Sequence, residues 1–406
     1  MKPSTSSLTA HISVAALLLS APVAAVRADA ITDWNIKAGQ LIVESRLGTP
    51  PAIRVMAIAQ TAVHDAVDEA ARRQASAPGA SLDAAVAAAN RAVLGKLLPA
   101  QQPSIDAAYR AALEQIDDGP SRAAGIAIGE RAAATVLARR ADDGALPGET
   151  YRPHTTPGAY VPTAAPAAPQ WSKRRPWLMT DAAQFRPAPP PALTSATWAR
   201  DYNEVKRVGA KTSSHRSAEQ TEIARFWEYS LPPIYHGVVR SVAQMPGRDA
   251  LRNARLFAAV AQAMDDALIS VFDAKYHYNF WRPSTAIRNG DVDGNEATER
   301  EPSWLPLIDA PLHPEYPSAH SILAAAVGTV LKADLRDSAA PSLATTSPTA
   351  KGVTRQWSGV EEFISEVGLA RIYEGIHYRT SVDVGTAMGR EIGELAVARH
   401  FDGAAH

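Results

Sequence analysis

Three short segments in the last third of the chain carry residues that can hold and transform a group rich in negatively charged oxygens. They are Lys275–Pro283, His313–His320 and Arg371–His377. Their candidate site residues include three cations, a hydroxyl and two imidazoles. Cations and N–H donors stabilise the oxygens of a tetrahedral or trigonal-bipyramidal oxyanion, and imidazoles serve as acid, base or nucleophile. The segments therefore predict a pocket for phosphate or vanadate.

The first segment places two cations seven residues apart, at Lys275 and Arg282. On one continuous helix they would lie on the same face about two turns apart, and Pro283 would end that helix. A solvated helix face is the alternative interpretation. The position of Arg282 between Trp281 and Pro283 favours the anion site, because free solvation is poor there.

The second segment is a proline-containing turn that leads into an apolar helix from Ser318 to about Leu331. Ser318 is expected near the N-cap, so the amides of Ala319 and His320 are among the unpaired donors of the first turn. Such a helix start can bind an anion. The alternative is an ordinary cap with His320 on the surface.

The third segment joins Arg371 to His377 across Gly375, and a further helix is expected from about Val382 to Phe401. One histidine after one arginine is more often structural than functional. The order and internal spacing of all three segments therefore indicate the pocket more strongly than any one segment does.

These residues resemble the signature of the vanadium-dependent haloperoxidase and type 2 phosphatidic acid phosphatase superfamily. That signature is Lys-x6-Arg-Pro, then Pro-Ser-Gly-His, then Ser-Arg-x5-His-x3-Asp. The chain departs from it at three positions, with Ala319 for Gly, Ala370 for Ser and Ser381 for Asp. Ser381 and the nearby Asp383 are candidate outer partners of His377, because a ligand imidazole normally has its second nitrogen bound to another group.

Further stretches resemble the secreted bacterial haloperoxidase-like branch of this superfamily, namely Ala30–Asn35, Ala52–Val67 and Phe272–Pro283. The resemblance implies a vanadate cofactor with His377 as its axial ligand and His320 as an acid/base. Phosphate could occupy the same site. The vanadate oxygens would be bound by Lys275, Arg282, Arg371, the Ser318 hydroxyl and the Ala319 amide. His313 would lie on the side of the site where halide binds, or else would be a polar turn residue before Pro314. Asp266 could be an outer partner of the vanadate-binding residues, or simply a charged residue on its helix.

The resemblance leaves three functions open. A haloperoxidase would use hydrogen peroxide to oxidise halide, with bromide or iodide favoured, to a hypohalous-acid equivalent that halogenates small organic acceptors. A secreted acid phosphatase would use His377 as nucleophile through a phosphohistidine, which Ser381 in place of Asp mildly disfavours. A non-catalytic oxyanion-binding protein would have no evident need for both imidazoles and all three cations.

The whole chain limits these functions further. It has 406 residues, with 41 Lys and Arg against 42 Asp and Glu, so a nucleic-acid partner is not expected. Residues 1 to about 30 resemble a secretory signal, which predicts export to the periplasm or medium. Other stretches are too short or too charged to span a bilayer. There is no cysteine, which excludes disulfides and thiolate sites. Nothing indicates the oligomeric state.

Helical periodicity dominates the rest, without clear strand alternation. We predict an all-α helical bundle of the haloperoxidase/acid phosphatase type, as one domain over residues 31–406 with a helical part at 31–215 and a catalytic part at 216–406. A Pro-rich segment, about 153–191, should be irregular and packed across the bundle, and 336–351 should be a surface loop. The expected helices are 53–72, 82–98, 103–116, 122–140, 218–229, 248–276, 318–331 and 382–401.

Removal of the secretory signal gives a direct test. Mass spectrometry of the exported protein should find an N-terminus near Asp29 or Ile31, because small residues precede both positions. Active protein that retains Met1 in the cytosol would refute export.

Overall fold

The computed structural model describes residues 29–74, 79–146, 151–336, 338 and 341–402. The expected secretory signal therefore lies, except for its last two residues, outside the described residues. Within those ranges the chain is helical apart from irregular segments and one two-stranded hairpin, so the predicted all-α bundle is confirmed with one addition. None of the described helices is long and apolar enough to cross a membrane.

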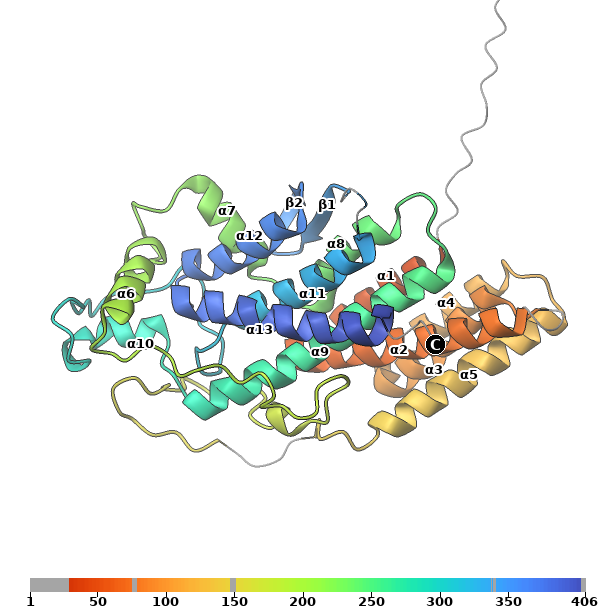
Figure 1. Cartoon of the computed structure of the whole chain (residues 1–406), viewed down its shortest axis with the longest axis horizontal. Coiled ribbons are helices and arrows are strands. Elements are labelled where there is room, and N and C mark those ends of the chain that lie inside the picture. Colours follow the sequence, from red (N-terminus) through yellow and green to blue (C-terminus); the bar gives the residue numbers. More distant parts are fainter. Residues whose placement is uncertain (1–28, 75–78, 147–150, 337, 339–340, 403–406) are drawn as a thin grey trace, which may run out of the picture.

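The helices follow one another as an elongated bundle (Figure 1). The N-terminal part contains α1 (Ala30–Glu44), α2 (Thr49–Gln74), α3 (Leu82–Leu97), α4 (Gln102–Leu113), α5 (Pro120–Arg140) and α6 (Ala196–Val208). The C-terminal part contains α7 (Ala218–Trp227), α8 (Pro232–Ala243), α9 (Ala250–Tyr278), α10 (Pro283–Arg288), α11 (Ala319–Leu335), α12 (Val360–Tyr373) and α13 (Arg379–Val397).

Helix α9 is the central element of the bundle. It packs against α2 on one side and against α11 and α13 on the other, while α3 and α5 pack together beyond α2. Nearly all of its residues between Asn253 and Lys275 are buried, which explains its long apolar and alanine-rich sequence. One core of apolar side chains runs from Ile31 in α1 to Ala396 in α13.

All eight expected helices are present, but five others were missed: α1, α6, α8, α10 and α12. Helix α8 shows one reason. Its first two residues are Pro232 and Pro233, which look like helix breakers in a sequence but fit the first turn of a helix, where the missing N–H removes no hydrogen bond.

The expectation that residues 336–351 form only a surface loop is wrong. Strand β1 (Leu343–Ser347) pairs antiparallel with β2 (Ala350–Trp357) and packs against α8. The inward positions of β1 include Thr345 and Ser347, so there was no apolar alternation to recognise. Gly237 of α8 permits this packing, because a Cβ there would lie 1.9 Å from Thr345 Oγ1.

The expected helix through Lys275 and Arg282 is also wrong. Helix α9 ends at Tyr278, and Asn279 adopts the left-handed conformation with φ of 49°. Arg282 is the N-cap residue of α10, and Pro283 is the first residue of that helix rather than the end of the preceding one. Arg282 therefore reaches the site from a turn and not from the helix face that carries Lys275.

The Pro-rich segment is packed across the bundle, as predicted. Its one short 3-10 turn, η2 (Trp171–Lys173), contacts α9. Arg174 is buried and binds Asp265 of α9 at 2.6 Å and Asp143 at 2.8 Å. The carboxylate of Asp266 accepts the backbone amides of residues 177–179 at 2.7–3.0 Å. These bonds attach an irregular segment to the central helix.

Removal of the Arg174 side chain should destabilise the protein strongly. Arg174→Ala leaves the buried carboxylate of Asp265 without its cation and Asp143 with Arg54 alone, and breaking a buried ion pair typically costs about 3–5 kcal/mol. Urea unfolding would measure the loss, and Arg152→Ala is the control because Arg152 lies in the same irregular stretch and is exposed. Equal stability of the two variants would contradict the role given to Arg174.

Candidate active site

The turn that precedes α11 carries the central residues of the site. Ser318 is the N-cap of α11, as predicted, although the hydrogen bond from Ser321 N to Ser318 Oγ is long at 3.4 Å. The Ser318 hydroxyl also accepts from Ser321 Oγ at 2.8 Å, and Ser318 N donates to Ser381 O of α13. The start of α11 is thus fixed against α13.

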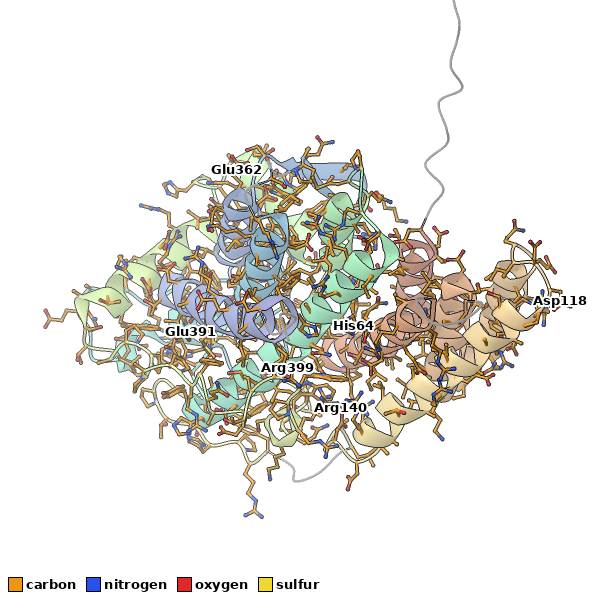
Figure 2. The ribbon with its side chains drawn as sticks, turned by 45° about the vertical axis from the view of Figure 1, so that its right-hand side comes forward. His64, Asp118, Arg140, Glu362, Glu391 and Arg399 are labelled. Atoms are coloured by element: carbon orange, nitrogen blue, oxygen red, sulfur yellow. The ribbon has the colours of Figure 1, made fainter. Side chains whose placement is uncertain are left out.

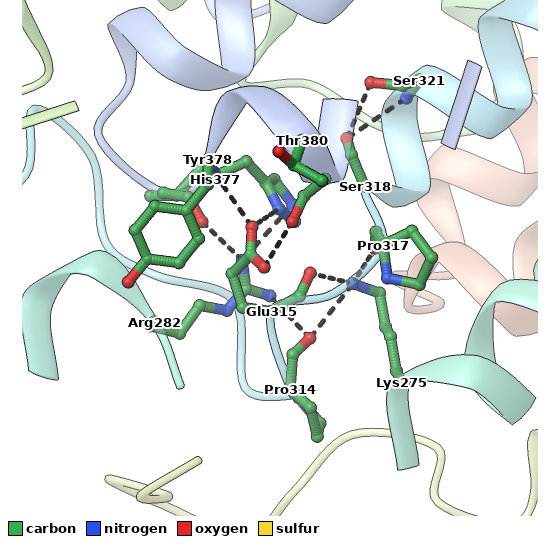
Figure 3. Close-up of polar contacts among 12 residues, drawn as sticks. Lys275, Arg282, Pro314, Glu315, Pro317, Ser318, Ser321, His377, Tyr378 and Thr380 are labelled. Carbon is green, nitrogen blue, oxygen red and sulfur yellow. Dashed lines mark hydrogen bonds and ion pairs between the residues drawn. The ribbon is translucent and has the colours of Figure 1, made fainter. Parts of the chain in front are cut away.

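Lys275 lies beneath this turn. Its fully buried amino group donates to the backbone carbonyls of Pro314, Glu315 and Pro317, as Figure 3 shows. Burial lowers the pKa of Lys275 well below its ordinary value, and the nearby Arg282 acts in the same direction. The three carbonyl acceptors match the three N–H donors of the protonated amine, so Lys275 fixes the turn and places positive charge behind it.

Arg282 joins the second and third segments. Its Nε donates to His313 O at 3.0 Å, and Nη2 lies 3.0 Å from His313 Nδ1. Its Nη1 donates to Ile376 O at 2.9 Å and lies 3.3 Å from His377 Nε2. Burial lowers its pKa to about 10. Because a guanidinium can only donate, its contacts with the two imidazoles require accepting ring nitrogens.

His377 is held on its other side by a carboxylate that we did not anticipate. Glu315 Oε1 lies 2.7 Å from His377 Nδ1 and accepts Tyr378 N at 3.1 Å, while Oε2 accepts Ser381 Oγ at 2.6 Å (Figure 3). Glu315 has no exposed surface. The second segment thus supplies the carboxylate that the Ser at position 381 cannot.

These contacts define the form of the His377 ring. With Nδ1 as donor to Glu315 and Nε2 as acceptor from Arg282, the lone pair lies on Nε2. Burial lowers the pKa of His377 well below its ordinary value, and Arg282 and Lys275 add to this shift. A neutral imidazole oriented in this way can act as a metal ligand or a nucleophile.

A cavity of about 290 Å³ lies beside His377. Five residues expected at the site line it: His313, Ala319, His320, Arg371 and His377. The other lining residues are Gly48, Thr49, Pro50, Ala167, Ser230, Leu268, Phe272, Pro311, Leu312 and Leu323. Lys275, Arg282 and Ser318 do not line the cavity and are buried near it, so the structure gathers the predicted residues in two layers.

Two buried polar atoms of lining residues have no hydrogen-bond partner among the described residues. They are His320 Nε2 and Arg371 Nε. His320 also bonds to the backbone of Tyr229, while Arg371 donates from Nη1 to Trp227 O at 2.8 Å and to Glu374 at 2.6 Å. Buried polar groups normally find partners, so these two atoms are suited to bind a polar guest in the cavity.

Gly375 makes the bend between Arg371 and His377. It has a φ of 78°, and a Cβ there would lie 2.4 Å from Gly209 O. Only glycine accommodates both the left-handed backbone and this close approach. The bend lets Arg371 leave from α12 while His377 precedes α13, so both side chains reach one cavity.

Two expected outer residues lie elsewhere. Asp266 uses both carboxylate oxygens for the backbone of the Pro-rich segment, and Asp383 is exposed and lines a separate surface hollow with Arg379 and Arg390. Ser381 does contribute, but through Glu315.

Two buried carboxylates were missed, Glu315 and Glu374, with pKa values raised by burial to about 7 and about 8. Their only signal was their position inside the second and third segments.

Several known proteins are similar to this chain. A family model described as the VCPO second helical-bundle domain matches residues 255–403. The vanadium chloroperoxidase of Curvularia inaequalis is 28% identical in an alignment of 208 residues that covers 43% of this chain. The match spans only 34% of that relative's length.

Solved structures cover more of the chain. A bacterial vanadium-dependent iodoperoxidase is similar with a TM-score of 0.77 and 25% identity, over 91% of this chain and 95% of the other. The holo form of a bacterial vanadium-dependent chloroperoxidase has a TM-score of 0.68 and 19% identity, over 90% and 96% of the two chains, which shows a shared fold. The family model covers the three site segments from Lys275 onward, and the chain has the fold of vanadium haloperoxidases over most of its length.

Proposed function

We propose that the protein is a vanadate-dependent haloperoxidase, an enzyme that oxidises halide with hydrogen peroxide and so halogenates small organic acceptors. The observation that carries the proposal is the orientation of His377. Its Nδ1 is bound to Glu315, so the lone pair lies on Nε2, whose contact with Arg282 Nη1 is long at 3.3 Å, and His377 lines the cavity. A neutral histidine with its second nitrogen bound to a carboxylate is a frequent form of metal ligand.

The residues of the cavity fit vanadate. His377 Nε2 would bind the metal, and the unpartnered atoms of Arg371 and His320 would bind oxygens with the first-turn amide at Ala319. Lys275, Arg282 and Ser318 would act from behind, the two cations through their charge. When bound, vanadate supplies a Lewis acid that activates peroxide for attack by halide.

His320 is suited to proton transfer. Burial lowers its pKa well below the ordinary value, with Arg371 acting in the same direction, so the ring is neutral and can take a proton from peroxide at Nε2. A bound anion beside it would favour the protonated form and so allow the ring to return that proton.

The halide would approach from the apolar side of the cavity. His313 lies there, with its ring centre 5.2 Å from that of Phe272, and Leu268 and Leu312 line the same space. Weakly hydrated bromide or iodide would lose less on entering such a space than a more strongly hydrated anion would. We therefore retain bromide or iodide as the favoured substrate and His313 as the halide-side residue, and we propose that the exported protein acts outside the cytoplasm.

A phosphatase remains the second candidate, because one observation favours it. Glu315 supplies the carboxylate partner that Ser381 cannot supply. A His377 nucleophile would therefore still have a carboxylate to orient it. Purified vanadate-free protein should be assayed for bromide and iodide oxidation with and without orthovanadate, beside aryl phosphate hydrolysis. Aryl phosphate turnover without any vanadate-dependent halide oxidation would overturn the haloperoxidase proposal.

Two histidine variants should separate binding from chemistry. His377→Ala should abolish vanadate-dependent halide oxidation and weaken vanadate binding, because the direct protein ligand is lost. His320→Ala should retain vanadate binding and lower the turnover rate by about 10²–10⁴-fold, the usual contribution of general acid/base catalysis. Equilibrium dialysis gives the binding and halide oxidation gives the rate. Identical losses of binding in both variants would contradict the two roles.

Glu315 should matter through His377. Glu315→Ala removes the acceptor for Nδ1, and loss of such an outer partner typically lowers metal affinity or activity about 10–100-fold. Vanadate affinity by dialysis is the measurement, and Glu296→Gln is the control because Glu296 is exposed in the same part of the chain. Unchanged affinity in folded Glu315→Ala protein would show that His377 needs no carboxylate.

A further inference from the structure

A second hollow lies on the surface away from the active-site cavity. Its volume is about 610 Å³, and its walls come from α2, α5, α9, residues 175–178 and the turn that follows α13. Gln262 at this hollow and Phe272 at the active site are ten residues apart on α9, or about 15 Å along the helix axis. We refer to this second hollow as the arginine groove.

Positive charge predominates in the groove. Arg139, Arg140, Arg175 and Arg399 line it, and Asp65 is its one acidic lining residue. Asp65 binds Arg139 at 2.9 Å. Arg140 is buried and is held by the carbonyls of residues 175 and 176 and by the ring of Trp177, 3.4 Å from its guanidinium carbon. Arg175 and Arg399 are exposed, so the groove has a net positive charge with two accessible guanidinium groups.

A rare backbone conformation places part of this charge. Residues Ala398–Asp402 form a turn of π-helix directly after α13. Such turns are uncommon and occur often at functional sites. The turn brings Arg399 and His400 to the groove, and Figure 2 shows Arg399 on the same face as His64 and Arg140.

The floor of the groove is an ordered polar chain. His400 Nε2 lies 2.9 Å from Gln262 Oε1, and Gln262 Nε2 donates to Thr61 Oγ1 at 3.0 Å. The rings of His400 and His64 meet edge to face at 5.9 Å. A floor held in this way is preorganised, which lowers the entropy cost of binding a ligand.

A hollow lined mainly by apolar side chains adjoins the charged one. It measures about 380 Å³, shares Trp177, Leu178 and Arg399 with the groove, and extends to Leu395. Arginine beside apolar surface is suited to a molecule with an anionic head group and an apolar body. The head group would bind the guanidinium, and the body would contact the apolar side chains.

We propose that the arginine groove binds an organic anion, with its carboxylate or phosphate group at Arg175 and Arg399 and its apolar body along Trp177, Leu178 and Leu395. The inference is independent of the proposed haloperoxidase activity. It uses residues that the active site does not.

Titration calorimetry with octanoate and octyl phosphate tests the proposal, with octan-1-ol as the uncharged probe. Orthovanadate should be present in excess, so that octyl phosphate does not compete for the active-site cavity. The wild-type protein should bind the two anions and not the alcohol, and binding should weaken as salt rises. Binding of only one anion would support the groove and identify the preferred head group.

Arg399→Gln should weaken binding at least about fivefold, because a charge-assisted hydrogen bond is lost. Arg175→Gln provides a second variant, and Arg207→Gln on α6 is the control because it removes an exposed charge elsewhere. Equal affinity in wild type and both groove variants would overturn the proposal. So would equal binding of octan-1-ol, or inorganic phosphate as tight as octyl phosphate, since that would show ion binding only.

Discussion

The carboxylate of Glu315 bonds to three groups that follow the bend at Gly375, at and just before the start of α13. It contacts His377 Nδ1, the amide of Tyr378 and the hydroxyl of Ser381, and it has no exposed surface. A buried carboxylate is tolerated only when such partners replace water. The hydrogen bonds that offset the cost of burying Glu315 therefore also fix the orientation of the His377 imidazole, on which the site depends.

Three cations of the site are buried, and their partners differ. Lys275 and Arg282 bind backbone carbonyls, whereas Arg371 binds the carboxylate of Glu374. A carbonyl dipole satisfies a donor without cancelling its charge. Lys275 and Arg282 thus remain a source of positive potential beside the cavity. An oxyanion can be stabilised by this potential even where a cation does not touch it, because screening is weak in a buried site.

The sequence predicted the residues that the structure gathers at the cavity, apart from the two buried carboxylates, and most of the long helices. It identified α9, α11 and α13 because their apolar residues recur at helical spacing. The prediction from sequence was wrong where proline can either end or begin a helix. Pro283 begins α10 instead of ending α9, and Pro232 and Pro233 begin α8. It also failed at β1, whose inward residues are partly polar and whose place depends on Gly237 in a distant helix.

The partner of His377 shows why the site could be predicted only in part. The predicted outer partners of His377 were Ser381 and Asp383, because both lie close to it in the sequence. The structure supplies the carboxylate from Glu315, 62 residues earlier, and uses Ser381 as a donor to that carboxylate. An Asp at position 381 would place a second negative charge against Glu315, which like-charge repulsion disfavours. The serine and the glutamate therefore form one compatible pair, so the departure at position 381 and the glutamate in the second segment have a common physical explanation.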